Sequence, residues 1–360
     1  MKNQQSPFVV LCQDKTLRIL FIGSGKSVPS TRFRVLPFAE QLRRRGHRCD
    51  VAMSFPEKYD SFRWLGWRGS QLLKRTIRRW HTLLARLRDY DAIVIEREVY
   101  HDNTWEREAH FRAAARRLIL DVDDGVFLNN VEKFDRISGM CDAVVVGNRY
   151  LMEYFQPRCP EVHLIPTCVT LADYQLRVQP SAEHRVTLGW IGTTHNVMFL
   201  QECASALRRV ALDIPFRLLV VATTDERLGE VDLSGVNVEF RAWDPDREVA
   251  DLHEMDIGLM PLRQDEPWMK YKCGLKLVQY LAVGSPGIAT PIGVNAEILE
   301  GGRVGRAATT DEQWETALRE LLMDPVLRQQ LGQAGRKLVE EQFSIEGNLD
   351  RFESILRGSE

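Results

Sequence analysis

The sequence predicts an α/β protein of two tandem Rossmann-like domains that face a central cleft. Short apolar runs alternate with helix-length segments along the whole chain, a pattern typical of parallel sheets covered by helices on both faces. The alternation begins at residues 17–22 and starts again at 186–191. The length of 360 residues also exceeds what one ordinary hydrophobic core supports. We therefore expect two open sheets whose carboxyl edges line one cleft.

Apolar runs of strand length account for both expected sheets. The first sheet is predicted from residues 17–22, 48–53, 92–96, 118–121, 143–146 and 163–166. The second is predicted from residues 186–191, 216–221, 236–240, 257–260 and 287–289. Apolar residues at helical spacing predict helices at 31–45, 63–88, 197–211, 311–323, 325–342 and 344–356.

The predicted domain boundaries follow from this alternation. Residues 1–172 form the first domain and residues 185–343 the second, and residues 344–360 form a C-terminal helix. The segment 171–184 carries little apolar periodicity and contains Pro180, which is typical of a linker.

The composition excludes several classes of protein. A net charge of −2 argues against general nucleic-acid binding, which requires a basic excess. Seven cysteines without a C-x-x-C pair indicate reduced thiols and a cytoplasmic location. The apolar run at 7–12 is too short for a secretory signal. No apolar stretch reaches membrane-spanning length, so any membrane contact is expected to be peripheral.

The first predicted strand ends in a glycine turn, Gly23-Ser-Gly25-Lys-Ser. A Walker A loop requires a glycine where Leu20 stands, and a dinucleotide fingerprint requires a glycine or alanine where Val28 stands. Ser54, rather than an acidic residue, also closes the second strand, which disfavours a dehydrogenase. Gly23 and Gly25 are therefore either contacts to a ligand in the cleft or a structural turn.

Two arginines follow this turn, and a carboxylate cluster ends a later strand. Arg32 and Arg34 are either solvated charges or donors to an anionic acceptor, since guanidinium groups bind anions in fixed geometry. The D-x-D-D run at 121–124 could supply a base, a metal site, a clamp for an acceptor hydroxyl or a helix cap. We take Asp123 as the candidate catalytic carboxylate and expect no metal.

Residues 63–88 form a basic segment with a helical pattern. Apolar residues share one side of the predicted helix, and lysine and arginine residues share the other. Such a helix either covers the first sheet with its apolar side or lies on an anionic membrane surface. The tryptophans and the local positive charge make peripheral contact with the inner face of the membrane a possible role.

A phosphate site is predicted in the second half. Gly192 and Thr193 follow a strand directly, so their backbone can approach a diphosphate. Gly274 starts a helix whose first amides are unpaired, and Lys272 and Lys276 flank this start. Together these features predict a seat for a phosphorylated ligand.

Five segments of the chain resemble the retaining family-4 glycosyltransferases of the GT-B fold. They read CDAVVVGNRYLMEYF, VHLIPTCVTLADY, TLGWIGTTHN, DIGLMPL and KCGLKLVQYLAVGSPGIATPIGVNAEIL. The likeness extends over nearly the whole chain. It implies that the first domain binds an acceptor, that the second binds a nucleotide sugar such as a UDP- or GDP-sugar, and that no cofactor is required. The last helix is then expected to return to the first domain.

The resemblance also assigns roles to single residues. Lys276 and Lys272, with the amides of Gly274 and Leu275, would stabilise the leaving diphosphate, and Lys276 counts as a catalytic candidate. The family carries two glutamates eight positions apart, near the donor sugar and on the ribose. Tyr271 and Gln279 stand at these positions, and Gln279 would still bind the ribose.

The resemblance implies transfer with retention and without a metal. The acceptor would be the hydroxyl of a glycan, a lipid-linked molecule or a small molecule. Loss of both glutamates leaves a second interpretation open, in which the protein binds a sugar nucleotide or glycan without catalysis.

Overall fold

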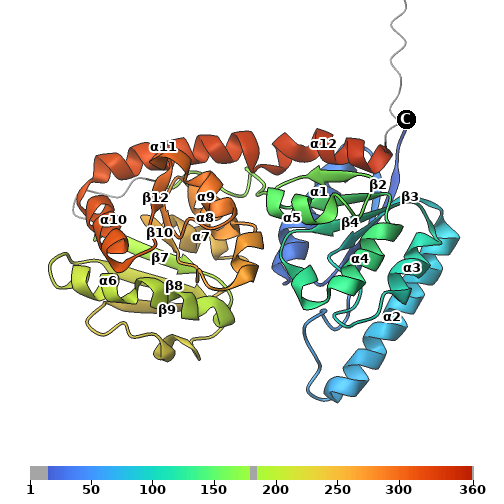
Figure 1. The fold of residues 1–360 in the computed structure, drawn as a ribbon, viewed down its shortest axis with the longest axis horizontal. Coiled ribbons are helices and arrows are strands. Elements are labelled where there is room, and N and C mark those ends of the chain that lie inside the picture. The colour runs from blue at the N-terminus through green and yellow to red at the C-terminus, as the bar shows by residue number, and fades with distance from the viewer. Residues whose placement is uncertain (1–14, 179–184, 359–360) are drawn as a thin grey trace, which may run out of the picture.

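The structure confirms the predicted fold class of two parallel α/β domains. It is a computed structural model that describes residues 15–178 and 185–358. The predicted features at residues 7–12, Cys12 and Pro180 lie outside the described residues. Each domain contains a six-stranded parallel sheet with helices on both faces, and the two domains lie side by side (Figure 1).

The first domain is built on a sheet with strand order β2-β1-β3-β4-β5-β6. Its strands are β1 (Arg18–Gly23), β2 (Arg48–Met53), β3 (Tyr90–Glu96), β4 (Ala115–Val122), β5 (Ala143–Val146) and β6 (Val162–Leu164). Its helices are α1 (Leu36–Arg44), α2 (Gly66–Arg88), α3 (Glu106–Arg112), α4 (Val131–Met140) and α5 (Arg149–Phe155), with short turns η1 (Thr31–Val35) and η2 (Val126–Asn129).

The second domain repeats this plan with strand order β12-β11-β10-β7-β8-β9. Its strands are β7 (Thr187–Ile191), β8 (Arg217–Ala222), β9 (Val238–Ala242), β10 (Ile257–Met260), β11 (Gly287–Ala289) and β12 (Gly305–Ala307). Its helices are α6 (Gln201–Ala211), α7 (Glu248–His253), α8 (Leu275–Ala282), α9 (Val294–Ile298), α10 (Asp311–Met323) and α11 (Pro325–Gln342), with short turns η3 (Thr194–Leu200), η4 (Leu228–Glu230), η5 (Pro267–Tyr271) and η6 (Glu300–Gly302).

Strand β12 is the strand that the sequence analysis did not predict. It has only three residues and begins with a glycine, so it lacks the apolar run that identifies a buried strand. The segment is a strand because its backbone pairs with β11, although its sequence has no strand pattern. The predicted helix at 31–45 is also divided, because a π-helical turn at Thr31–Val35 precedes α1.

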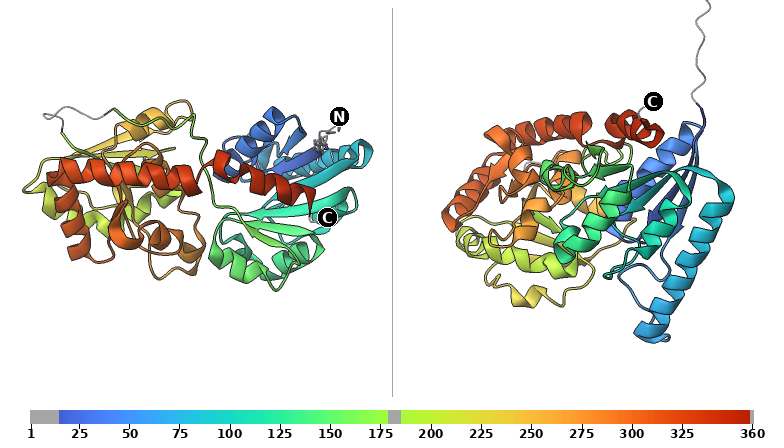
Figure 2. Two further views of the ribbon diagram at one scale, coloured as in Figure 1. Left: turned by 90° about the horizontal axis from the view of Figure 1, so that it is seen from above. Right: turned by 45° about the vertical axis from the view of Figure 1, so that its right-hand side comes forward.

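The chain returns to the first domain through its last two helices. Helix α11 lies along the second domain, and α12 (Ile345–Arg357) lies along the first (Figure 2). Phe352 of α12 packs on Phe38 of α1 and on Phe21 of β1, with ring centroids 4.5 and 6.3 Å apart. Val169, after the last strand of the first domain, pairs with Ser344, so two segments cross between the domains side by side.

Helix α2 contradicts the expectation that its apolar side covers the first sheet. The buried residues of α2 are Ser70, Lys74, Arg78, Thr82 and Ala85. Most of these side chains are polar, whereas Leu72, Trp80, Leu83 and Leu87 are exposed. Lys74 and Arg78 donate to backbone carbonyls of the first domain, and these hydrogen bonds make the polar side the inward one.

Candidate functional site

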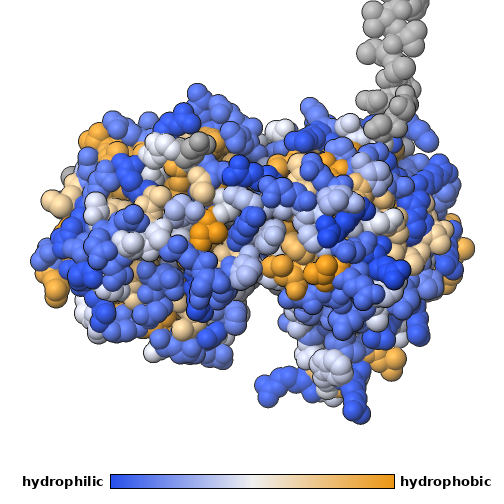
Figure 3. Space-filling view, viewed as in Figure 1, coloured by the Kyte–Doolittle hydropathy of each residue, from blue (hydrophilic) through white to orange (hydrophobic). Residues whose placement is uncertain are grey.

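The carboxyl ends of the strands bring most predicted site residues to the junction of the two domains. In the first domain, Gly23 ends β1, Asp121 lies near the end of β4, and Asp123 and Asp124 follow β4. In the second domain, Gly192 follows β7 and α8 begins at Leu275. The surface between the domains is hollowed in the space-filling view (Figure 3). This arrangement is that of two parallel sheets whose binding edges face each other.

Gly192 and Lys276 are in direct contact. A methyl group on Gly192 would lie 2.7 Å from Lys276 Cε and 2.8 Å from the Trp190 ring, so a side chain here would displace the lysine. The ammonium of Lys276 lies 5.5 Å from the centroid of the Trp190 ring. The pKa of Lys276 is lowered to about 8, first because burial desolvates the ammonium and then because Lys272 is near.

The start of α8 has the geometry of an anion site. Gly274 precedes the helix with φ +69°, a left-handed conformation that side chains disfavour. A methyl group there would also lie 3.1 Å from Val294 Cγ1. Lys276 lies in the first turn of α8, and Lys272 is near enough to lower its pKa, so two cations adjoin the helix start, and a phosphate is the ligand that matches this chemistry. Thr193 is exposed beside this site.

Asp123, the predicted catalytic carboxylate, is bound by an arginine, and its catalytic role stays a prediction. This carboxylate is buried and accepts two hydrogen bonds from Arg97, at 2.6 Å from Nε and 2.9 Å from Nη2. Burial raises the pKa of Asp123, but Arg97 outweighs burial, so the pKa lies below its ordinary value. Arg97 itself adopts φ +58°, a strained conformation held by this pair.

Asp124 is the carboxylate of this cluster that is partly open and faces the second domain. Its side chain is 17% exposed, against 5% for Asp123. Burial raises the pKa of Asp124 above its ordinary value, although nearby Lys272 and Arg97 act in the opposite direction. The interaction with Lys272 places Asp124 beside the phosphate seat, so the candidate catalytic carboxylate moves by one residue.

Arg34 is not available to an acceptor, contrary to prediction. It is 2% exposed and binds both oxygens of Asp121, at 2.5 and 2.9 Å, and it also donates to the Ile165 carbonyl. Burial lowers the pKa of Arg34, but the attraction of the Asp121 carboxylate raises it by more. The pKa of Arg34 therefore lies above its ordinary value, and the guanidinium stays charged. Arg34 therefore stabilises the edge of the first sheet.

Arg32 also departs from its predicted role, because it binds the second domain. Its guanidinium donates to both oxygens of Glu248, at 3.0 and 3.1 Å, and lies 4.9 Å from the Trp243 ring centroid. Glu248 further accepts hydrogen bonds from Tyr174, Trp243 and Gln279. We call Arg32, Tyr174, Trp243, Glu248 and Gln279 the junction cluster. Gln279 is thus buried under an ion pair between the domains.

Tyr271, which replaces the first glutamate of the resembled motif, packs between the domains. Its ring meets Phe127 edge to face with centroids 5.0 Å apart. Its carbonyl accepts a hydrogen bond of 2.9 Å from Asn148 Nδ2. Lys270, the third lysine of this segment, lies 4.8 Å from the Tyr150 ring centroid of the first domain. Tyr271 and Lys270 therefore contact the first domain from the second.

The glycine turn after β1 is held by hydrogen bonds to Glu96. This buried carboxylate accepts hydrogen bonds from the Ser24 amide and hydroxyl, at 2.7 and 3.0 Å, and from the hydroxyls of Ser30 and Thr31. Gly25 lies against Glu57, where a methyl group would come within 2.5 Å of the carboxyl carbon. Gly23 and Gly25 keep a narrow turn at the cleft, and their contact with a ligand stays a prediction.

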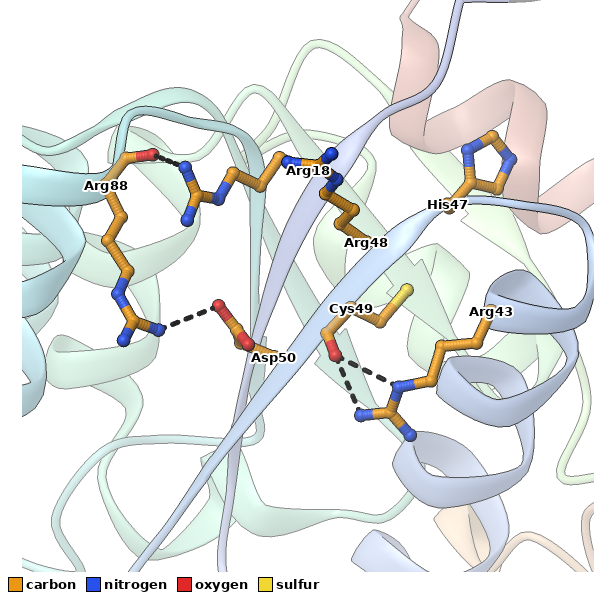
Figure 4. A pocket seen from close by; sticks show the side chains of 7 residues that line it. All are labelled: Arg18, Arg43, His47, Arg48, Cys49, Asp50 and Arg88. Carbon is orange, nitrogen blue, oxygen red and sulfur yellow. Dashed lines mark hydrogen bonds and ion pairs between the residues drawn. The ribbon is translucent and has the colours of Figure 1, made fainter.

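A separate cavity lies at the opposite edge of the first sheet. It is lined by Arg18, Arg43, His47, Arg48, Cys49, Asp50 and Arg88 (Figure 4). Arg18 and Arg48 begin β1 and β2, so this edge points away from the domain junction. Arg43 donates to the Cys49 carbonyl and Arg88 pairs with Asp50, and these contacts tie the edge together.

The predicted absence of a metal remains a prediction. Among the described residues, no group of three or more histidine, cysteine, aspartate or glutamate residues is arranged to bind a metal ion. The first two carboxylates of the D-x-D run are bound by Arg34 and Arg97.

Of the residues that shape the site, Glu96 and Arg97 were expected near this edge of the cleft, because they stand at the end of a predicted strand, whereas Glu248 was not predicted. Glu96 ends β3, and Arg97 directly follows it. Glu248 is distant in sequence from each of its partners except Trp243, and no local pattern marks it. A buried carboxylate with several donors is recognised only from its surroundings.

Sequence comparison finds a family model that matches most of the second domain and one curated relative. Residues 185–324 match the family model described as Glycosyl transferases group 1. N-acetyl-alpha-D-glucosaminyl L-malate synthase from Bacillus anthracis is 25% identical over 170 residues, which are 46% of this chain and 43% of that protein. The chain thus aligns with less than half the length of that relative.

Structure comparison extends the likeness to both domains. Sucrose-phosphate synthase from Thermosynechococcus elongatus superposes with a TM-score of 0.68 at 15% identity, over 94% of this chain and 98% of that one. HepE from Anabaena in complex with UDP-glucose superposes with a TM-score of 0.66 at 13% identity, over 94% and 99%. The likeness shows the GT-B fold.

Proposed function

We propose that this protein is a glycosyltransferase that moves a sugar from a nucleotide-sugar donor to an acceptor hydroxyl. The observation that carries the proposal is the convergence of Lys272, Lys276 and the start of α8 beside Gly192. This anion seat belongs to the domain that matches the group 1 glycosyltransferase family. HepE, a similar fold, is described in complex with UDP-glucose, which supports a UDP-sugar as the donor.

The diphosphate of the donor would bind at the anion seat. Lys276 and Lys272, with the amides of Leu275 and its neighbours, would stabilise the charge that develops on the leaving group. The backbone of Gly192 and the hydroxyl of Thr193 would line the diphosphate. Asp124 would lie across from Lys272, near the sugar and the incoming hydroxyl. These positions are fixed before substrate binds, which is what electrostatic stabilisation requires.

Ribose binding by Gln279 requires a change in the junction cluster. The Gln279 amide donates to Tyr174 and Glu248, at 3.0 and 3.1 Å, beneath the Arg32 ion pair. We infer that the donor displaces Arg32 from Glu248 as it enters. The carboxylate of Glu248 and the amide of Gln279 then face the ribose hydroxyls together.

Retention of configuration and metal independence are also part of the proposal. Arg34 and Arg97 neutralise Asp121 and Asp123, which supports a structural role for the D-x-D carboxylates. Two lysines at the anion seat supply positive charge that a metal supplies in other enzymes. The acceptor would be a glycan or a lipid-linked molecule bound by the first domain, at the inner face of a membrane.

The test is a titration of the purified protein with UDP-, GDP- and other nucleotide sugars by calorimetry, followed by an assay of donor hydrolysis and transfer. We expect one class of nucleotide sugar to bind and to be hydrolysed slowly without acceptor. Absence of binding to every nucleotide sugar would overturn the proposal.

A second candidate function is binding of a sugar nucleotide or glycan without catalysis. The observation that favours it is the use of Tyr271 and Gln279 for contacts between the domains in place of two glutamates. Such a protein would bind the donor with a normal affinity and show neither hydrolysis nor transfer. Single-turnover assays at high protein concentration distinguish the two functions.

A further inference from the structure

Helix α2 is an amphipathic helix with its polar side turned inward. Ser70, Lys74, Arg78 and Thr82 recur at intervals of four residues and share one buried side. Arg78 donates to the carbonyls of Ala52 and Gly23, at 2.7 and 2.6 Å. These carbonyls lie at the ends of strands of the first sheet. Long cationic side chains of α2 therefore pack on the sheet, where a covering helix normally packs apolar side chains.

Part of the apolar side of α2 faces outward and is exposed, whereas Leu73, Ile77 and Leu84 on the same helix are half-buried. Among the large apolar residues of this region, those with high exposure are Phe55, Tyr59, Trp64, Trp67, Leu72, Trp80, Leu83 and Leu87. The three tryptophans are 79%, 68% and 58% exposed in chain order. Hydrophobic side chains are visible on the outer side of α2 at the lower right of Figure 3. A contiguous apolar surface of this kind marks an interaction site.

A row of arginines borders this apolar side. Arg68, Arg75, Arg79 and Arg86 are exposed and recur at intervals of seven, four and seven residues, so they share one flank of the helix. No acidic residue occurs between Gly66 and Arg88. Within the described chain no carboxylate pairs with Arg68, Arg79 or Arg86, whereas Arg75 pairs with Asp102. Exposed tryptophans beside unpaired cations match the interface of an anionic bilayer.

The same segment is joined to the glycine turn at the cleft. The Lys58 amide donates 2.8 Å to the Ser24 carbonyl, and Glu57 accepts from the Ser27 amide at 3.0 Å. Lys74 of α2 in turn donates to the Lys58 carbonyl at 2.8 Å. The outward face of α2 and the turn after β1 are therefore parts of one hydrogen-bonded unit.

We propose that the outward face of α2, with the tip at Trp64 and Trp67, docks on an anionic lipid bilayer. The tryptophans and leucines enter the interface between headgroups and acyl chains, and the arginine row binds lipid phosphates. The proposal of membrane docking does not depend on the proposed glycosyltransferase function. One consequence rests on the proposed function: the glycine turn is then presented to an acceptor that is itself embedded in the membrane.

Docking is tested with the full chain and without any nucleotide sugar, so that its failure is separate from failure of the transferase proposal. Co-sedimentation is measured with phosphatidylcholine vesicles that contain or lack phosphatidylglycerol. We expect binding to the anionic vesicles only. The triple variant Trp64→Ser/Trp67→Ser/Trp80→Ser and the triple variant Arg68→Glu/Arg79→Glu/Arg86→Glu should each reduce it at least about tenfold.

The matched control removes exposed apolar residues from the second domain: Leu212→Ser/Met323→Ser/Val326→Ser. These side chains are 85%, 72% and 60% exposed, so their loss changes surface hydrophobicity without touching α2, and vesicle binding should persist. Circular dichroism verifies the fold of each variant. Equal binding of the tryptophan variant and the wild type would overturn the proposal. A second outcome would also overturn it: the wild type forms a dimer in sedimentation equilibrium and does not bind vesicles, and the tryptophan variant is monomeric. The outward face of α2 would then bind a second copy of the chain.

Discussion

At the scale of the residue, the environment of Lys276 should make the affinity of the candidate site for a diphosphate depend on pH. Its ammonium is desolvated and lies near Lys272, and its pKa falls to about 8. The group is a cation below this value and is neutral above it. A diphosphate binds the cation, so we expect affinity for UDP to weaken as pH rises through 8.

The measurement is calorimetry with UDP between about pH 7 and pH 9, on the wild type and on Lys276→Arg, whose guanidinium stays charged throughout. The arginine variant should show a smaller decrease than the wild type. Lys276→Ala should lose about 1.5–3 kcal/mol of binding free energy, the usual value of a hydrogen bond to a charged group. Lys337→Ala, on an exposed face of α11, serves as the control and should bind normally.

Substitutions of the adjacent carboxylates Asp123 and Asp124 should have different effects, the first on stability and the second on activity. Asp123→Ala removes both hydrogen-bond acceptors of Arg97 and leaves it only a 3.9 Å contact with Asp124, so we expect the free energy of unfolding to fall by up to about 3–5 kcal/mol. Asp124→Asn should change it by less than about 1 kcal/mol and instead lower the transfer rate. Urea denaturation and a transfer assay measure the two effects. A folded, fully active Asp124→Asn variant would assign no chemical role to this residue.

At the scale of the element, α2 shows that hydrophobic pattern and buried face can disagree. The spacing of its apolar residues predicts a helix correctly, yet Lys74 and Arg78 turn the other side inward. The reason is that the carbonyls of Gly23 and Ala52, at the ends of β1 and β2, accept hydrogen bonds from Arg78, which an apolar side chain cannot donate.

This arrangement predicts an inverted pattern of mutational effects along α2. Arg78→Leu removes the side-chain donor to the Ala52 carbonyl and leaves the Gly23 carbonyl with the Ser54 amide alone, so it should reduce the free energy of unfolding by about 1–3 kcal/mol. Leu72→Ser and Leu83→Ser alter exposed positions and should change it by less than about 0.5 kcal/mol. Thermal and urea denaturation measure these changes. A large loss for the two leucine variants and none for Arg78→Leu would show that the apolar side is the buried one.

At the scale of the whole molecule, the junction cluster couples the two domains. Arg32 comes from the first domain, Tyr174 from the connecting segment, and Glu248 and Gln279 from the second. The ion pair is 20% and 6% exposed, so it is shielded from most solvent screening. Access to Gln279 therefore depends on this ion pair, which holds the domains together beside the contacts of Tyr271 and Lys270 with the first domain.

Breaking this contact should open the molecule. For Arg32→Ala we expect a larger radius of gyration in small-angle X-ray scattering, because the domains lose a link across the cleft. Arg44→Ala removes an exposed pair within α1 and is the matched control. A double-mutant cycle of Arg32→Met and Glu248→Gln should give a coupling energy of about 0.5–3 kcal/mol. Zero coupling would show that the two side chains act independently.

Much of the fold could be predicted because it depends on local patterns. Apolar runs located the strands except β12, whose three residues carry no pattern and which forms only by pairing with β11. The residues of the anion seat were also predicted, since a glycine before a helix and nearby lysines are sequence features. Their convergence on Gly192 is what the structure adds.

The sequence by itself determined two tandem parallel-sheet domains, because strand and helix periods are local properties. The phosphate seat at the start of α8 follows from helix-terminal chemistry, which is also local, and it stays a prediction. Only the tertiary structure decided which charges remain available. It paired Arg34 with Asp121, Arg97 with Asp123 and Arg32 with Glu248, and it turned the polar side of α2 inward. These outcomes depend on partners distant in sequence, since a buried charge is stable only beside an opposite charge or a hydrogen-bond acceptor.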